Sequence, residues 1–131
     1  MHRICCTLCF LVAAATPVKA QTLDYTCNVG LLQISIHVDI DARSVTQRVY
    51  SGSTVLTAEY MNGVFGRVSE RGMATLIPPM RQFVHIDQDA ISYGGELDGA
   101  RDTAILDRRK SILTLPNGNA GWCSMASSTQ K

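Results

Sequence analysis

Apolar and polar residues alternate along much of this chain. Between residues 34 and 40, isoleucine and valine occupy every second position, and Ser, His and Asp occupy the positions between them. Successive side chains of a β-strand point to opposite faces, so this period of two predicts a strand with one buried and one solvated face. Turn-forming residues follow at 41–44, and apolar positions resume from Val45 to Tyr50. These segments predict a β-hairpin.

Two further hairpins are predicted downstream. Residues 54–60 and 64–68 flank Asn62-Gly63, a dipeptide that tolerates the positive φ angles of a type I′ turn. Residues 104–106 and 112–115 flank the charged sequence 107–111. Both arrangements predict antiparallel pairs with a tight connection.

The remaining apolar segments are shorter. Residues 73–77, 83–86 and 91–93 are strand candidates, whereas the glycines from Gly94 to Gly99 predict a loop. No segment has the period of an amphipathic helix. Seven or eight short strands at roughly 8–12-residue spacing predict an all-β protein, a small antiparallel β-barrel or sandwich.

The first twenty residues have the organisation of a secretory signal. A basic start precedes an apolar stretch from Ile4 to Ala15, and Val18-Lys19-Ala20 supplies the small-residue end. About twelve apolar residues are too few to span a bilayer, which needs about 20. A lipoprotein signal fits less well because Leu8 precedes Cys9. We therefore expect a signal peptide at 1–20, a single β-domain at 21–131 without a transmembrane segment, and export to a periplasm or secretion.

The chain has five cysteines, and three of them lie within the predicted signal. Cys27 and Cys123 remain, near the two ends of the predicted domain. Disulfides persist in the oxidising compartments that exported proteins reach. The sequence therefore predicts a Cys27–Cys123 disulfide that closes the domain end to end.

Charge argues against nucleic acid as a partner. Without Arg3 and Lys19, ten Lys and Arg residues stand against eleven Asp and Glu residues, a net charge of about −1. Nucleic-acid-binding domains usually carry a net positive charge or a clustered basic stripe. The three-residue basic sequence Arg108-Arg109-Lys110 is a possible interaction tip, although charged turns also serve solubility alone.

Two histidines of the predicted domain are candidates for chemistry. His37 lies two residues from Asp39 on the same strand face, which suits a base, but no G-x-S-x-G or comparable motif supplies a nucleophile. His85, Asp87 and Asp89 could contribute metal ligands, yet three such residues in one short segment are more typical of a polar turn. The sequence therefore assigns no catalytic residue, no metal ligand and no cofactor.

The sequence Tyr25-Thr26-Cys27, the alternating strand after it and the late Cys123 resemble the periplasmic inhibitors of c-type lysozyme in general architecture. The resemblance implies a small antiparallel β-barrel of a proteobacterial envelope. Ser51-Gly52-Ser53 comes too early for the Ser-Gly-rich stretch of that family, and the single Trp122 stands beside the last cysteine instead of in a Trp-Lys-Gly segment. The resemblance therefore assigns no inhibitory residue.

These observations predict a small exported, non-catalytic protein that binds an unidentified protein or envelope component, in the manner of an inhibitor. An accessory structural subunit of an envelope or secretion assembly is the first alternative, and a minor hydrolase is the second. We also expect Trp122, the neighbour of Cys123, to pack over the disulfide.

Overall fold

The computed structural model describes residues 21–66, 69–71 and 80–126, and all the regular elements in these ranges are strands. The predicted signal, the predicted strand at 73–77 and part of the predicted strand at 64–68 lie outside the described residues, and the division at residue 20 stays a prediction. The elements are β1 Thr22–Val29, β2 Leu32–Asp39, β3 Ser44–Ser51, β4 Thr54–Met61, β5 Phe65–Gly66, β6 Ser69–Arg71, β7 Met80–Ile86, β8 Ala90–Leu97, β9 Ala100–Asp107, β10 Ile112–Thr114 and β11 Ala120–Met125.

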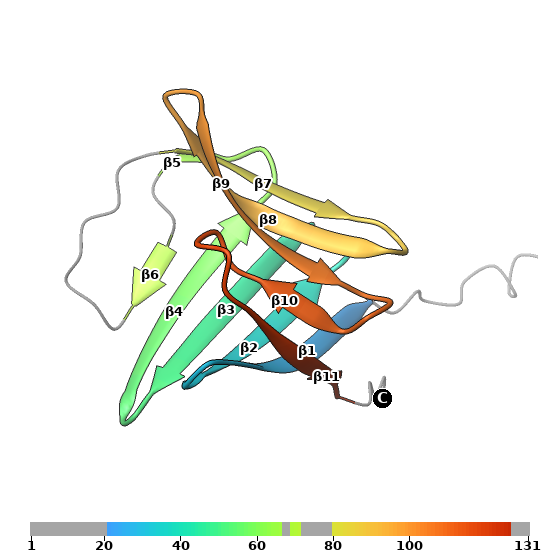
Figure 1. Ribbon diagram of the computed structural model, residues 1–131. Coiled ribbons are helices and arrows are strands. Elements are labelled where there is room, and N and C mark those ends of the chain that lie inside the picture. Colours follow the sequence, from blue (N-terminus) through green and yellow to red (C-terminus); the bar gives the residue numbers. More distant parts are fainter. Residues whose placement is uncertain (1–20, 67–68, 72–79, 127–131) are drawn as a thin grey trace, which may run out of the picture.

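The strands form one antiparallel sheet in the order β5-β7-β8-β9-β10-β11-β1-β2-β3-β4-β6. The sheet curls so that β7 to β9 lie across the β1–β4 layer (Figure 1). The backbone amide of Gly63 donates a hydrogen bond to the backbone carbonyl of Gln82 at 3.0 Å, and the backbone amide of Gln82 donates one to the carbonyl of Val64 at 2.8 Å. These bonds join the end of β4 to β7, so the nine strands from β7 round to β4 make a nearly closed barrel.

The barrel interior is filled by the apolar phase of the alternating strands. Ile34, Ile36 and Val38 of β2 are at most 1% exposed, whereas the intervening Ser35 and His37 face outward and are partly exposed. The same phase buries Val45 on β3, and the core continues through Tyr25, Cys27, Val29, Val84, Ile91, Tyr93, Ala104, Leu106 and Leu113. Burial on one face therefore fixes the register, because a shift by one residue would expose the whole apolar set.

The predicted all-β barrel class is confirmed, with more strands than the predicted seven or eight. The first hairpin is confirmed by β2 and β3, which pair with Val38 opposite Val45. The third is confirmed by β9 and β10, which pair with Asp107 opposite Ile112. Both connections are short.

The predicted hairpin around Asn62-Gly63 is wrong. A turn does form there, with the Val64 amide donating to Met61 at 3.3 Å, but only Gly63 has a positive φ angle. After the turn, β5 pairs with β7 instead of returning along β4, and β4 pairs with β3 and β6. Barrel closure therefore overrides the local hairpin signal.

The predicted loop from Gly94 is also wrong at its start. Gly94 and Gly95 lie inside β8, between β7 and β9, and the turn begins only after Leu97. An added Cβ at Gly94 would lie 1.9 Å from the carbonyl oxygen of Asp102 on β9. Glycine is needed here because the neighbouring backbone approaches closely.

The predicted disulfide is confirmed. Cys27 on β1 faces Cys123 on β11 in directly opposed positions, and their sulfur atoms are 2.03 Å apart. The prediction for Trp122 is wrong: as the neighbour of an inward-facing residue on a strand, it points outward and is 70% exposed. The described residues contain no helix of the length and apolarity that a membrane span requires.

Candidate functional site

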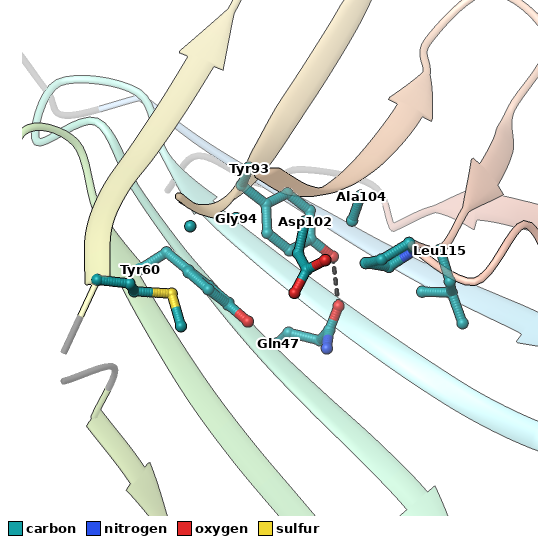
Figure 2. A pocket seen from close by; sticks show the side chains of 10 residues that line it. Gln47, Tyr60, Tyr93, Gly94, Asp102, Ala104 and Leu115 are labelled. Carbon is teal, nitrogen blue, oxygen red and sulfur yellow. Dashed lines mark hydrogen bonds between the residues drawn. The ribbon is translucent and has the colours of Figure 1, made fainter. Parts of the chain in front are cut away.

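A pocket of about 270 Å³ opens inside the curve of the barrel, and we call it the lumen pocket. It lies among inward-facing residues of β3, β4, β7, β8 and β9 and the start of the β10–β11 loop (Figure 2). Its polar lining is Gln47, Tyr60, Tyr93 and Asp102, and its apolar lining is Met80, Ala104, Leu115 and Pro116. The backbone of Gly94 and Gly95 completes it.

Strand phase places the polar groups of the lumen pocket. Gln47 occupies an inward position of β3 between Val45 and Val49, where alternation would otherwise supply a third apolar side chain. Asp102 likewise shares the inward phase of β9 with Ala104 and Leu106. Inward-facing positions of a small barrel are usually apolar. Gln47 and Asp102 therefore mark the boundary between the apolar core and the lumen pocket.

Tyr93 anchors the floor of the lumen pocket. It is 1% exposed, and its hydroxyl donates a hydrogen bond to Oε1 of Gln47, the dashed line in Figure 2. Its ring centroid lies 5.4 Å from that of Tyr60, at an interplanar angle of 56°. Burial, with a smaller contribution from Tyr60, raises the pKa of Tyr93 far above its usual value. The phenol is therefore a neutral donor at physiological pH.

Asp102 supplies the charge of the lumen pocket. The residue is exposed, and Figure 2 shows its carboxylate directed into the pocket on the side of Gln47. Among the described lining residues it is the one with a charged side chain, and no described residue forms an ion pair or side-chain hydrogen bond with it. An uncompensated carboxylate beside two aromatic rings attracts positively charged groups.

The two glycines shape the wall of the lumen pocket. An added Cβ at Gly95 would lie 1.7 Å from the sulfur of Met80, so the Met80 side chain lies directly over this glycine. Gly94 allows β9, and with it Asp102, to approach β8 closely. The two glycines therefore allow the Met80 thioether and the Asp102 carboxylate to lie on the same side of the barrel wall.

The structure gives His37 a different carboxylate from the predicted one. His37 Nδ1 lies 2.6 Å from Oδ1 of Asp24, which is directly opposite on β1, whereas Asp39 caps the β2–β3 turn through the Ala42 amide at 3.0 Å. Both members of the His37–Asp24 pair are about half exposed on the outer face of the barrel. Among the described residues, no hydroxyl or thiol is hydrogen-bonded to His37.

Of the three candidate metal ligands, His85 and Asp87 contact each other, whereas Asp89 binds elsewhere. His85 Nε2 lies 3.5 Å from Oδ2 of Asp87, and Oδ1 of Asp87 accepts the backbone amides of Ala90 and Asp89. Those backbone bonds, the Ala90 bond most strongly, lower the pKa of Asp87, and His85 contributes less. The Asp89 carboxylate instead binds Arg109. No group of three or more candidate ligands assembles within the described part of the chain.

The basic tip is attached to the neighbouring hairpin. Nη1 of Arg108 donates to the Asp87 carbonyl at 2.7 Å, and Nε of Arg109 binds the Asp89 carboxylate at 2.7 Å. The Arg108 amide also donates to the Asp89 carbonyl at 2.8 Å. Two of the three basic residues therefore hold the β7–β8 turn against the β9–β10 turn. Among the described residues Lys110 has no such side-chain partner, and a role of the tip in recruiting a partner stays a prediction.

The sequence analysis did not identify Gln47 and Asp102 as site residues. Gln47 interrupts the apolar phase of a predicted strand, whereas Asp102 precedes the predicted strand at 104–106 and lies within β9. Comparison with known proteins adds nothing to this assignment, because no family model, no curated protein and no solved structure matches the chain.

Proposed function

We propose that this protein is an exported, non-catalytic binding domain whose ligand site is the lumen pocket, and that the pocket accepts an organic ammonium group. The observation that carries the proposal is the uncompensated carboxylate of Asp102 in a pocket lined by Tyr60 and Tyr93. Ammonium groups are attracted both by a carboxylate and by the faces of aromatic rings.

The size of the pocket limits the ligand. Sites for small molecules usually have volumes of about 300–1,000 Å³, so a pocket of about 270 Å³ suits a small amine or a single side chain. A lysine side chain of a partner protein has the same ammonium group on an apolar stem. Met80, Ala104 and Leu115 provide the apolar wall for such a stem. The proposal thus includes inhibitor-like binding of a protein.

A binding role is also consistent with the arrangement of the His37–Asp24 pair. Neither residue lines the lumen pocket, and a general base acts only within hydrogen-bond reach of the proton that it removes. In this proposal the His37–Asp24 pair is a cross-strand contact of the outer face, and Asp102 attracts a positively charged ligand but performs no reaction.

Calorimetric titration of the purified, disulfide-bonded protein tests the proposal. The probes are butylammonium, tetramethylammonium and a short peptide with one lysine, so a free amine and a protein side chain are compared. Asp102→Asn removes the charge and keeps the shape. Asp98→Asn is the matched control, because Asp98 lies in the β8–β9 turn and is exposed but does not line the pocket.

We expect Asp102→Asn to weaken binding about tenfold or more, the effect of losing about 1.4 kcal/mol or more of a charged contact. Asp98→Asn should leave the affinity unchanged. Equal weakening by the two substitutions would mean that overall charge, and not the pocket, attracts the ligand. Absence of binding for all three probes would refute the proposal.

A further inference from the structure

A second cavity, of about 330 Å³, lies on the outside of the barrel between the β2–β3 turn and strands β7 to β9. We call it the outer groove. Its principal lining residues are Arg43, Phe83, His85, Ser92, Arg101 and Thr103. It shares no lining residue with the lumen pocket, so it is a separate candidate site.

Strand register places the lining of the outer groove on the outer face of the sheet. Phe83 and His85 occupy the outward phase of β7, and Phe83 is directly opposite Gly94, which in turn is opposite Thr103 on β9. Because Gly94 has no side chain, the row from Phe83 to Thr103 has a gap at its centre. Gly94 itself lines the lumen pocket and not the outer groove, and the Arg101 side chain crosses this row to reach the ring of Phe83.

Hydrogen bonds hold Arg43 at the edge of the outer groove. Arg43 has a φ angle of 52° in the β2–β3 turn, and its carbonyl accepts the Asn62 amide at 3.1 Å. Oδ1 of Asn62 in turn accepts the Val84 amide at 2.9 Å. This connection fixes the turn against β7, so the Arg43 side chain starts from a defined position beside the groove.

Arg101 lines the outer groove from β9. Its guanidinium carbon lies 4.4 Å from the ring centroid of Phe83, a cation–π contact that orients the group over the ring. Stacking uses the face of a guanidinium and leaves its N–H edges available for planar, bidentate bonds to an oxyanion. No described residue forms an ion pair with Arg43 or Arg101.

The charges of the groove indicate the ligand. Its described lining contains two arginines and no acidic residue. Glu96 is directly opposite Arg101 on β8 but is neither part of this lining nor ion-paired with Arg101 among the described residues. A phosphate group carries nearly two negative charges at neutral pH and offers several acceptor oxygens. The hydroxyls of Ser92 and Thr103 and the ring of His85 add polar contacts in the same groove.

We propose that the outer groove binds a phosphate group of an organic phosphate through Arg43 and Arg101. The cavity has room for more than the phosphate, and Phe83 lines it beside Arg101. The phosphate comes from a soluble molecule or from a lipid headgroup, and the recognition chemistry is the same in both cases.

Titration followed by two-dimensional amide NMR tests this site. The soluble probes are inorganic phosphate and glycerol 3-phosphate, and the lipid probe is a phosphatidylcholine vesicle that contains phosphatidic acid. Arg43→Gln and Arg101→Gln each remove one guanidinium. Arg48→Gln is the matched control, because Arg48 is an exposed arginine on β3 that does not line the groove. Thermal unfolding verifies each variant, and Arg43→Gln tests the site independently if Arg101→Gln does not fold.

We expect glycerol 3-phosphate to shift the amides of Ser92 and Thr103, with about tenfold weaker affinity in each groove variant, as expected for the loss of a charged hydrogen-bonding partner. Arg48→Gln should retain wild-type affinity. Vesicle binding that glycerol 3-phosphate displaces would identify a lipid headgroup as a source. Equal affinities for wild type and both groove variants, or an equal loss in Arg48→Gln, would overturn the proposal.

Discussion

Cys27 and Cys123 are 96 residues apart in sequence, yet they are directly opposed on β1 and β11, with their Cα atoms 3.9 Å apart. The disulfide therefore joins the first strand to the last at a position where the sheet ladder also connects them. Cys27 is fully buried, and Cys123 packs against the same core. The disulfide and the core consequently stabilise the same junction of β1 and β11, which we call the seam of the barrel.

The first prediction concerns this seam. Cys27→Ser should lower the free energy of unfolding by about 2–5 kcal/mol, because loss of the bridge frees a long loop in the unfolded chain. Urea unfolding of the oxidised wild type and the variant measures the difference, and wild type in a reducing agent is the matched control. An unchanged urea midpoint would mean that the β1–β11 ladder alone holds the seam.

The second prediction concerns Gly94. Gly94→Ala should destabilise the protein on the order of 3 kcal/mol or more, because the new Cβ would clash with the backbone carbonyl of Asp102. Gly99→Ala is the control: Gly99 has a φ angle of 83° and an added Cβ there meets no atom within 4 Å. It should cost only the roughly 1–2 kcal/mol of a left-handed residue. Equal urea midpoints for the two variants would contradict the role of close strand approach.

Much of the fold could be predicted because its information is local. Residues 34–40 show a complete alternation, and the disulfide followed from two remaining cysteines. The β5–β7 pairing could not be predicted, since Asn62-Gly63 specifies a turn but not which strand the chain joins afterwards. Gly94 looked like a loop residue because its reason to be glycine is the backbone of Asp102, which lies on another strand.

The candidate site was less predictable for the same reason. The lumen pocket combines side chains from five strands, so its composition depends on register between segments far apart in sequence. Gln47 had a local signal, an amide between Val45 and Val49. The polar partner of His37 was predicted along its own strand, but the sheet places Asp24 opposite it. Cross-strand neighbours of this kind require the register to be known.

The third prediction concerns the pH dependence of stability. The pKa of Tyr93 is raised in the folded protein, whereas that of an exposed tyrosine in the unfolded chain is about 10. The unfolded state therefore loses this proton first, and the contribution of Tyr93 is complete below about pH 10 and decreases as the pH rises above it.

Tyr93→Phe tests this assignment. At pH 8 the variant should be less stable by about 0.5–1.5 kcal/mol, because the hydrogen bond to Gln47 is lost. Above about pH 10, wild-type stability should fall more steeply than that of the variant, so the two curves converge. Urea midpoints between pH 8 and about pH 11 measure both effects. Parallel curves over this range would show that Tyr93 does not control the alkaline decline.

The last prediction concerns the ion pair between Arg109 and Asp89, which joins two turns at one end of the barrel. Both side chains are more than 60% exposed, so solvent weakens their attraction. A double-mutant cycle of Arg109→Gln and Asp89→Asn should give a coupling energy of about 0.2–1 kcal/mol at low salt. The coupling should shrink at 1 M salt, where the screening length falls to about 3 Å.

Lys110→Gln removes a neighbouring charge that has no described partner and should change the free energy of unfolding by less than about 0.5 kcal/mol. A coupling energy that persists at high salt, or a larger effect on stability at Lys110 than at Arg109, would contradict this ion pair. The basic tip would then have no structural role, and binding of a partner would be its remaining predicted role.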